Sequence, residues 1–552
     1  MLGAAQFLMV LDSSVMNVSI SQLVADFDTS VASIQAVITF YALVMAALMI
    51  TGGRLGDLWG RRRTFGIGMA VYACGSALTA ISWSVPVLAL GWSVIEGVGA
   101  ALVMPALMAL IAGNYEGRER ATAYGVMGGI AGAGVAVGPI LGGWVTTYLT
   151  WRLVFVGEVV IAIAILVCLK VVDEVPHDGP KEKLDVVGAV LSAAGLGLVV
   201  FAMLRSSVWG WIDPKNAPFE PFGFAPTVFL IAAGLLVLAG FARWQRHREG
   251  VGSDPLVRLD RLRIPPLRSG LSMLLAQNLI LMGVFFAIPL YLQVVQGYNA
   301  FETGLRMLPV SIMLFIAAMS GPVLARRFSP RSIVRGGLGV LFVATIGLLA
   351  VLEPSIVTTQ FLIVMGALGA GLGLLSSQLG NVVQSAVGAD ARSEVGGLQN
   401  TAMQLGGAIG TALIGSIVIG GLATSLSASV MVDDRVSEPV KQQVGIALDS
   451  GISFVTTEQA AAALADADVP VDESAVIVDH YADAQLRALK TGLLLAALIT
   501  LLSFAFTAHL PADPLGGPED DVGPDPETAA AGGPDPEPAS PGDPWPRRPG
   551  AT

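Results

Sequence analysis

The chain is poor in charge, in cysteine and in histidine. Only 13% of its 552 residues are charged, and it contains two cysteines and four histidines. The histidines are too scattered for a zinc-type cluster, and no Ser-centred G-x-S-x-G motif occurs, which argues against a membrane enzyme. A phosphate-binding G-x-x-x-x-G-K-[ST] motif is also absent, so nothing indicates the use of ATP. Cys74 and Cys168 fall in apolar segments and are predicted to be buried small hydrophobic residues.

Long apolar segments are what the chain has in abundance. Apolar residues make up 54% of it and its mean hydropathy is +0.71, outside the usual range for a soluble globular protein. A membrane-spanning helix needs about 20 mainly apolar residues. The segments are too long and continuous for the strands of a barrel, so we predict an all-α membrane protein. The fourteen predicted spans are residues 3–22, 33–53, 64–83, 86–112, 121–147, 152–171, 186–206, 224–244, 269–293, 304–325, 332–352, 358–384, 396–421 and 487–508.

The distribution of basic residues predicts the orientation of the chain. With the N-terminus in the cytoplasm, 21 of the 31 lysines and arginines fall on the cytoplasmic side, as the positive-inside rule requires. These basic residues lie in the connections 54–63, 118–120, 170–183, 243–268 and 326–335 and at Arg392. An even number of spans returns the C-terminus to the cytoplasm. We therefore predict a multi-pass protein of the cell membrane with both termini inside, its first apolar segment being a retained helix rather than a signal peptide.

The spans divide into three groups. Residues 1–171 are predicted to form an N-terminal six-helix bundle and residues 269–508 a C-terminal one, with two inserted transmembrane helices at 186–244. Repeated halves of this kind are typical of secondary transporters. Residues 322–331 look like a degraded second copy of the Arg-rich turn at 53–63, which supports a duplication.

Two segments lie outside the bundles. Residues 422–485 form an external segment in which helical stretches such as 457–466 are expected, and a functional role and disorder both remain open for it. Residues 511–552 carry 12 prolines and nine acidic residues. This tail cannot bury enough apolar surface to fold alone, so we predict an acidic, Pro-rich, disordered cytoplasmic tail.

Three acidic residues within predicted spans are the main candidates for function. Asp12, Glu96 and Glu158 all lie in the first bundle. A charged group at the bilayer centre costs about 2.5–3.5 kcal/mol on insertion scales, so such residues are usually functional. A buried carboxyl group that gains and loses a proton suits proton coupling, and binding of a cationic substrate is a second possible role. The structural alternative is a carboxylate that is hydrogen-bonded to a neighbouring helix or faces a water-filled vestibule.

Three further sets of residues are weaker or more structural candidates. The fifth span is rich in glycine, which allows close helix packing, and its proline promotes a kink; the residues are Gly134, Gly138, Pro139, Gly142 and Gly143. The Arg-rich turn is predicted to hold one transport state and to anchor the topology; its residues are Gly53, Asp57, Gly60, Arg61, Arg62 and Arg63. Polar residues that suit substrate contact or interhelical hydrogen bonding are Asn17, Gln277, Asn278, Arg306, Gln399, Asn400 and Gln404.

These motifs resemble the fourteen-helix drug:proton antiporter branch of the major facilitator superfamily. Residues 53–63, GRLGDLWGRRR, match its loop pattern G-x-L-a-D-x-x-G-[RK]-[RK]-[RK] except that Gly56 replaces alanine. Residues 134–143 match the helix-5 motif that the family associates with antiporters. The stretches 11–18, 151–152, 291–293 and 397–401 extend the resemblance over nearly the whole chain. The resemblance implies the major facilitator fold and export of amphipathic, often cationic compounds in exchange for protons.

Two departures from the family pattern affect the candidate site. Where the family has an arginine in helix 4, this chain has Ser93, and Glu96 follows three residues later in place of glutamine. In helix 6 Glu158 and Val160 replace the family's Asn-x-Pro. The first bundle therefore lacks a base and gains two acids, and our hypothesis is that Glu96 and Glu158 assist Asp12 or attract a cationic substrate.

The sequence therefore predicts a proton-coupled antiporter for multidrug efflux and antibiotic resistance, not an enzyme. Its partners are a small-molecule substrate, protons and the lipid bilayer, with no nucleic acid, no metal and no cofactor other than the proton gradient, and we expect a monomer. The first alternative is a dedicated exporter of a lipid or secondary metabolite, in which residues 422–485 would hand the compound on. The second alternative, a membrane enzyme, is weaker, because the chain lacks a zinc-type histidine cluster and a Ser-centred motif.

Overall fold

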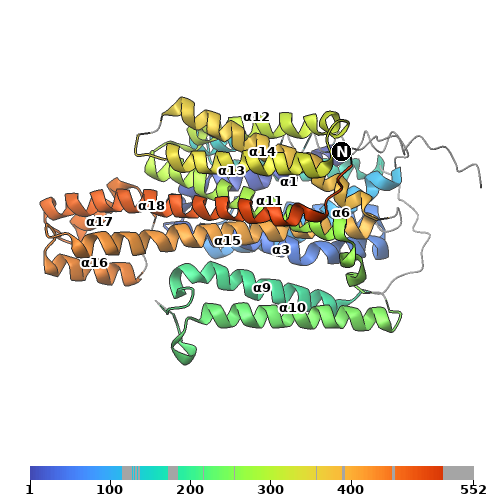
Figure 1. Cartoon of the computed structure of the whole chain (residues 1–552), viewed down its shortest axis with the longest axis horizontal. Coiled ribbons are helices and arrows are strands. Elements are labelled where there is room, and N and C mark those ends of the chain that lie inside the picture. The colour runs from blue at the N-terminus through green and yellow to red at the C-terminus, as the bar shows by residue number, and fades with distance from the viewer. Residues whose placement is uncertain are drawn as a thin grey trace, which may run out of the picture.

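The computed structural model describes residues 1–513 apart from 115–126, 128–129, 131–133, 135–136, 172–183, 215–216, 254, 356, 388–391 and 451–453. The described residues form helices and contain no strand (Figure 1). The predicted tail from 514 onward lies outside the described residues.

The first part of the chain contains ten helical elements with described bounds. They are α1 (Leu2–Val18), α2 (Ile20–Asp26), α3 (Val31–Trp59), α4 (Arg61–Ala80), α5 (Val85–Leu88), the π-helix η1 (Ala89–Glu96), α6 (Gly97–Asn114), α8 (Arg152–Cys168), η2 (Leu169–Val171) and α9 (Val186–Trp209). Residues 137–148 are also helical, and residue 149 forms a bend after them. They belong to the predicted span 121–147, most of whose first half lies outside the described residues.

The second part of the chain is likewise helical. Its elements are η3 (Pro221–Gly223), α10 (Pro226–Gly250), η4 (Leu259–Arg263), α11 (Pro265–Leu290), the π-helix η5 (Tyr291–Val295), α12 (Ala300–Ala325), α13 (Pro330–Val351), α14 (Thr358–Ser385), α15 (Arg392–Val432), α16 (Glu438–Ser450), α17 (Thr457–Asp466), α18 (Val471–Ser503) and η7 (Phe504–His509). Local sequence sets several of these starts. Asn299 and Glu302 form a capping box at the start of α12, and Ser30 and Ser329 cap α3 and α13.

Eleven helices in the described part are long and apolar enough to cross a membrane, and α1 with α2 makes a twelfth as a pair bent by 65°. The helix α4 overlaps the predicted span 64–83 but is not among them, and it begins with three arginines. The predicted span 121–147 is only partly described. The all-helical, multi-pass architecture is thus confirmed. The predicted number of fourteen spans is not confirmed, because the described residues contain eleven or twelve.

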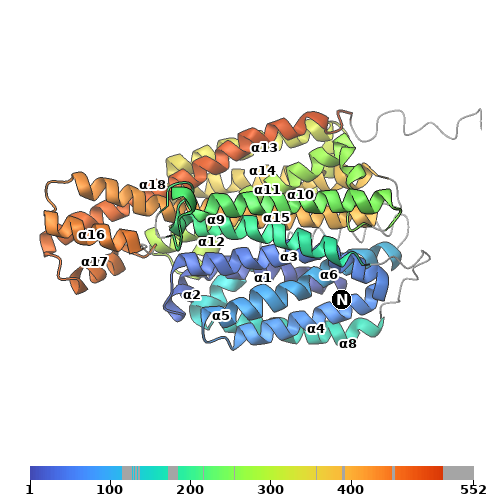
Figure 2. The same ribbon diagram turned by 90° about the horizontal axis from the view of Figure 1, so that it is seen from below.

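Two helices continue well beyond the predicted spans. The helix α15 ends at Val432 and not at 421, and α18 begins at Val471 and not at 487. Hydropathy reports only the apolar part of a helix, so polar turns outside the bilayer escape it. With α16 and α17 these extensions form a helical projection that we call the cap (Figures 1 and 2). The expected helical stretch at 457–466 is confirmed as α17.

The long helices run roughly parallel between two ends of the molecule (Figure 2). We call the end that carries α16 and α17 the cap end, and the opposite end, where Met1 lies, the N-terminal end. The inserted helices α9 and α10 pack on each other, and α9 contacts both α3 and α15, which also pack together. This hairpin therefore covers the line where the N-terminal and C-terminal helices meet.

The expected burial of the two cysteines is wrong. Cys74 on α4 and Cys168 on α8 are both free and exposed. Each lies on the outward side of its helix, where a bilayer rather than the protein interior surrounds an apolar side chain. An apolar environment in a membrane protein does not require packing inside the protein, and the sequence does not distinguish these two surroundings.

Candidate functional site

Asp12 lies near the middle of α1 and is completely buried. Its Oδ1 atom accepts a hydrogen bond of 2.6 Å from the indole Nε1–H of Trp92, and Oδ2 has no partner among the described residues. The ring of Trp92 stacks on that of Tyr41, with centroids 4.5 Å apart and an angle of 6° between the planes. Asp12 is therefore held against an aromatic pair contributed by two other helices, α3 and η1.

Glu96 ends the π-helix η1, where the chain passes into α6. A Cβ atom at Gly75 of α4 would lie 2.5 Å from the backbone nitrogen of Glu96, so the glycine lets α4 approach closely there. Glu96 is 0% exposed, and neither of its carboxylate oxygens has a hydrogen-bond partner within the described part of the chain. π-Helical segments within α-helices are frequent at functional sites, and η1 ends on an unpartnered, buried acid.

Glu158 lies on α8 and is 1% exposed. Its Oε2 atom accepts hydrogen bonds from the hydroxyl groups of Tyr72 at 3.1 Å and Ser76 at 3.2 Å, both on α4. Its other oxygen has no partner among the described residues. The carboxyl group is thus positioned from one side and open on the other.

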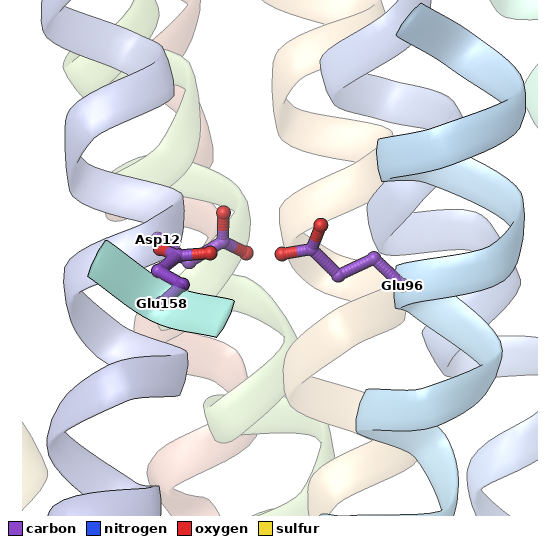
Figure 3. A group of neighbouring side chains, drawn as sticks. All are labelled: Asp12, Glu96 and Glu158. Atoms are coloured by element: carbon purple, nitrogen blue, oxygen red, sulfur yellow. The ribbon is translucent and has the colours of Figure 1, made fainter. Parts of the chain in front are cut away.

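The three acids meet in one cluster, which we call the carboxyl cluster (Figure 3). One oxygen from each of Asp12, Glu96 and Glu158 lies within 4.8 Å of the others. No lysine, arginine or histidine in the described part of the chain forms an ion pair with any of the three. Two unit charges at this distance repel by about 3–4 kcal/mol at an effective dielectric constant near 20. The cluster therefore needs compensation by protons or by a bound cation.

The carboxyl cluster is the one group of His, Cys, Asp and Glu side chains in the described residues that is close enough to hold a metal ion. Hard cations such as Mg²⁺ and Ca²⁺ prefer several oxygen ligands. Here Trp92, Tyr72 and Ser76 already donate hydrogen bonds to oxygens of Asp12 and Glu158. Four other oxygens of the cluster have no partner among the described residues, and carboxylates that bind metals commonly accept further hydrogen bonds. The donors therefore do not decide between a proton, an organic cation and a metal, and the absence of a metal stays a prediction.

The glycine-rich fifth span packs directly on the helix that carries Asp12. A Cβ atom at Gly134 would lie 2.9 Å from Val10, one at Gly142 would lie 2.7 Å from Val15, and one at Gly138 would collide with Ser14. Close approach to α1 is therefore what the glycines provide. At its cap end the same span meets the C-terminal helices, since Gly143 lies against the carbonyl of Ala300 and Pro139 against Gly304 of α12.

The Arg-rich turn joins α3 to α4, and Gly60 lies between them at a φ of 92°, a left-handed conformation that favours glycine. Arg61 donates a hydrogen bond of 3.3 Å to the carbonyl of Ala109, and Arg54 donates one of 3.0 Å to that of Pro255. A Cβ atom added at Gly53 would lie 3.6 Å from the side chain of Pro105. Arg62 is half-buried and Arg63 exposed. The side chain of Asp57 lies outside the described residues.

The weaker candidates are not brought to the carboxyl cluster by any described contact. Asn17 and Asn278 donate to carbonyls one turn earlier on their own helices. Gln277 bonds Ser376 at 2.5 Å, and Gln404 bonds the sulfur of Met45 at 2.8 Å. Gln399 pairs with Gln384, Arg306 lies 3.5 Å over the ring of Tyr298, and Asn400 is half-buried with no described partner. Interhelical polar packing therefore accounts for Gln277, Gln399 and Gln404, whereas Asn17 and Asn278 bond within their own helices.

The partners of the cluster were missed by the sequence analysis. Trp92, Tyr41, Tyr72 and Ser76 were not singled out there. Trp92 precedes Glu96 by four residues, so the two lie near each other on one helix. Tryptophans in membrane proteins are enriched at the lipid interface, so one within a span could have been recognised from the sequence as a candidate partner of the acids. Tyr72 and Ser76 share the same four-residue spacing on α4.

Comparison with known proteins gives a consistent picture. The family described as the Major Facilitator Superfamily matches residues 2–411. The tetracenomycin C resistance and export protein of Streptomyces glaucescens is 29% identical over 417 residues, covering 74% of this chain and 73% of that protein. The puromycin resistance protein of Streptomyces alboniger is 32% identical over 439 residues, covering 77% and 82%. The probable actinorhodin transporter of Streptomyces coelicolor is 30% identical over 441 residues, covering 78% and 74%.

The fold is also similar to that of solved structures. A bacterial homologue of the human lysosomal transporter Spinster, solved in an inward-facing and unoccupied conformation, superposes with a TM-score of 0.57 at 15% identity. That superposition covers 94% of this chain and 97% of the other. At this level of identity the likeness concerns the fold alone.

Proposed function

The chain belongs to the major facilitator superfamily, and on that premise we propose that it exports drug-like or antibiotic compounds in exchange for protons. It is a multi-pass membrane transporter rather than an enzyme. Its relatives are named for resistance to, or export of, tetracenomycin, puromycin and actinorhodin. Those names support export of a small molecule, and the carboxyl cluster supports the coupling.

The observation that carries the proposal is the burial of three carboxyl groups together without a basic partner. Asp12, Glu96 and Glu158 cannot all be charged in this site unless a cation enters it, because their repulsion and desolvation both oppose it. Protons and a cationic substrate are two ways to meet the same need, so each can displace the other. Competition of this kind is what antiport requires.

The aromatic rings beside the cluster support a cationic, amphipathic substrate. Tyr41 and Trp92 stack next to Asp12, and Tyr72 lies beside Glu158. Aromatic faces attract organic cations, by about 2 kcal/mol or more where the cation is desolvated. Carboxylates that lie beside aromatic rings bind a delocalised cation better than a small, strongly hydrated one.

We assign the direction of transport from charge and from the state of the structure. The N-terminal end carries the Arg-rich turn, which the positive-inside rule predicts to lie in the cytoplasm. At the cap end the two halves meet through Gln293 with Val18 and Phe301 with Thr147. Substrate then reaches the site from the cytoplasm, and protons from the more acidic outside compete for the cluster once the cap end opens.

Transport in reconstituted vesicles tests the proposal. An imposed pH gradient is expected to drive a cationic dye across the membrane, and an uncoupler is expected to stop it. The triple variant D12N/E96Q/E158Q keeps the size of the side chains but loses their charge and is expected to lose gradient-driven transport. Equal transport by the triple variant would disprove the coupling. Gln277→Leu, in the C-terminal helices, is the control for altering a buried polar residue.

A dedicated exporter of a secondary metabolite is the second candidate. It is favoured by relatives that are named for the export of single compounds, tetracenomycin and actinorhodin. A panel of chemically diverse dyes and antibiotics separates the two. Extrusion of many unrelated cations supports multidrug export, whereas extrusion of one structural class with no effect on the others supports a dedicated exporter.

A further inference from the structure

The first membrane helix is broken at Ser19, at the cap end of the molecule. The helix α1 ends at Val18, α2 begins at Ile20, and the two axes differ by 65°. A break of this kind leaves carbonyl groups at the end of the first helix and N–H groups at the start of the second without helical partners. Ser19, the N-cap residue of α2, does not supply one, because its side chain makes no capping bond and instead bonds Thr146 at 2.8 Å.

One side chain from the other half of the molecule satisfies both kinds of group. The amide nitrogen of Gln293 donates a hydrogen bond of 2.8 Å to the carbonyl of Val18. The amide oxygen of the same side chain accepts a hydrogen bond of 3.3 Å from the backbone N–H of Ser21. A primary amide has one acceptor and two donors in a fixed plane, so Gln293 fits the break as a replacement for the missing helical bonds.

The structure around Gln293 holds its side chain in place. It lies within the π-helix η5, at the end of α11, and is 6% exposed. Its neighbour Tyr291 donates a hydrogen bond of 2.7 Å from its hydroxyl group to the carbonyl of Glu353. The backbone N–H of Tyr298 closes the turn by bonding the carbonyl of Leu292 at 3.0 Å. The amide is therefore presented from a turn that is fixed within the C-terminal helices.

We propose that Gln293 is the latch that keeps the cap end of the transporter closed. The two halves can separate at the cap end only if both hydrogen bonds of the Gln293 amide break and water replaces them at Val18 and Ser21. The latch also has a physical link to the carboxyl cluster, since Val18 lies six residues after Asp12, about 9 Å along the same helix. A movement of α1 that follows loading of Asp12 acts directly on the latch.

This inference rests on the proposed alternating access, but its test requires neither transport nor a proton gradient. In a background in which both native cysteines are replaced (C74A/C168A), spin labels are placed by A25C on α2 and S355C between α13 and α14. Both positions are exposed and lie in different halves of the molecule. The distance distribution between the labels then reports the populations of the closed and open cap end.

Removing the latch is expected to favour the open cap end. In Q293L, which keeps the approximate size of the side chain, the ratio of the long to the short distance is expected to rise roughly fivefold to thirtyfold, the effect of losing one or two net hydrogen bonds. In Q293E the carboxylate still accepts from Ser21 but faces the carbonyl of Val18 without a hydrogen to donate. An increase at least as large as that of Q293L is expected there.

A neighbouring glutamine provides the matched control. Among the described residues Gln296 bonds only groups within its own half, namely the hydroxyl group of Tyr291 at 3.0 Å and the carbonyls of Glu353 at 3.0 Å and Pro354 at 3.1 Å. Q296L is expected to leave the distance distribution unchanged. Equal distributions in the parent, Q293L and Q293E would overturn the latch, and so would an equal shift in Q296L. A shift confined to the Gln293 variants in a protein without proton-coupled transport would keep the latch and refute the coupling.

Discussion

The polar residues buried in the N-terminal helices differ in kind from those buried in the C-terminal helices. Among described residues, the first region (1–171) buries three acids with unpartnered oxygens. The second region (269–513) buries mainly amides and hydroxyl groups, such as Gln378, which bonds the carbonyl of Gly321, and Thr345, which bonds that of Leu341. Amides and hydroxyls cannot change charge. This difference supports our proposal that the coupling groups lie in the first region, because among the described residues that region buries the three acids that can gain or lose a proton.

The largest expected effect is a loss of transport when a buried acid of the first region is replaced by its amide, compared with substitution of a buried amide in the second region. Each of D12N, E96Q and E158Q removes one titratable group and is expected to lower gradient-driven transport by roughly tenfold or more, as the loss of a charge-assisted interaction does. Gln277→Leu and Asn278→Leu are expected to change it less than about threefold. Initial rates in vesicles at fixed pH gradient provide the measurement. Equal losses of transport from substitutions in both regions would show that the buried acids have no special role in transport.

A second prediction concerns the donor to Asp12. Trp92→Phe removes the N–H group that donates to Asp12 at 2.6 Å but keeps an aromatic ring beside Tyr41. Hydrogen bonds to charged groups contribute about 1.5–3 kcal/mol, so transport is expected to fall by roughly tenfold to a hundredfold. Exchange of substrate for substrate at equal pH on both sides is expected to fall less. If W92F transports like the parent protein, the Trp92–Asp12 bond has no role in coupling.

A third prediction tests the close approach behind Glu96. An added methyl group at Gly75 would lie 2.5 Å from the backbone nitrogen of Glu96, whereas one at Gly157, next to Glu158, meets nothing within 4 Å. Gly75→Ala is expected to lower transport several-fold because it displaces the η1 turn, since overpacking costs about 1–3 kcal/mol. Gly157→Ala is the matched control and is expected to be neutral. Equal rates for both variants would contradict the packing argument.

The smallest expected effect lies in neither region but in the inserted hairpin. Burial raises the pKa of Asp185, but hydrogen bonds from Trp244, the backbone of Gly188 and Gln245, together with the charge of Arg248, outweigh it and hold the pKa below its usual value. A lowered folded-state pKa stabilises the protein above the unfolded-state pKa and loses that effect as the pH falls through the folded value. Asp185→Asn is therefore expected to lower the Tm by a few degrees at pH 7.

The same variant has a built-in control in its pH dependence. The difference in Tm between D185N and the parent is expected to shrink as the pH falls below about 4, because the Asp185 carboxyl is protonated first in the unfolded state and, at lower pH, in the folded state. A Tm difference that stays constant between pH 7 and the acidic limit would show that the charge of Asp185 is not what stabilises the hairpin.

Much of the fold could be predicted because hydropathy is a local property. Every predicted span that lies in the described residues overlaps a helix, and a charge within an apolar segment makes Asp12, Glu96 and Glu158 visible without a structure. That the three acids meet could not be predicted, since it depends on how α1, η1 and α8 pack. The partners of Gln293 depend in the same way on contacts between distant segments.

Other features of the structure were predicted wrongly or missed, each for a physical reason. The ends of α15 and α18 were missed because those turns are polar and lie beyond any hydropathy signal. The prediction that Cys74 and Cys168 are buried was wrong because an apolar residue can also face lipid. The Arg-rich turn shows the opposite case, since its residues were recognised by their pattern, yet the contacts of Arg54 with Pro255 and Arg61 with Ala109 were not foreseeable.

In the proposed mechanism protons and substrate compete for the carboxyl cluster, and this competition is measured as proton release by the purified protein when substrate binds. In weakly buffered detergent solution, addition of a cationic substrate to the parent protein is expected to release protons, whereas D12N/E96Q/E158Q is expected to release none. Proton release of equal size from the triple variant, in a protein that still binds the substrate, would contradict the account.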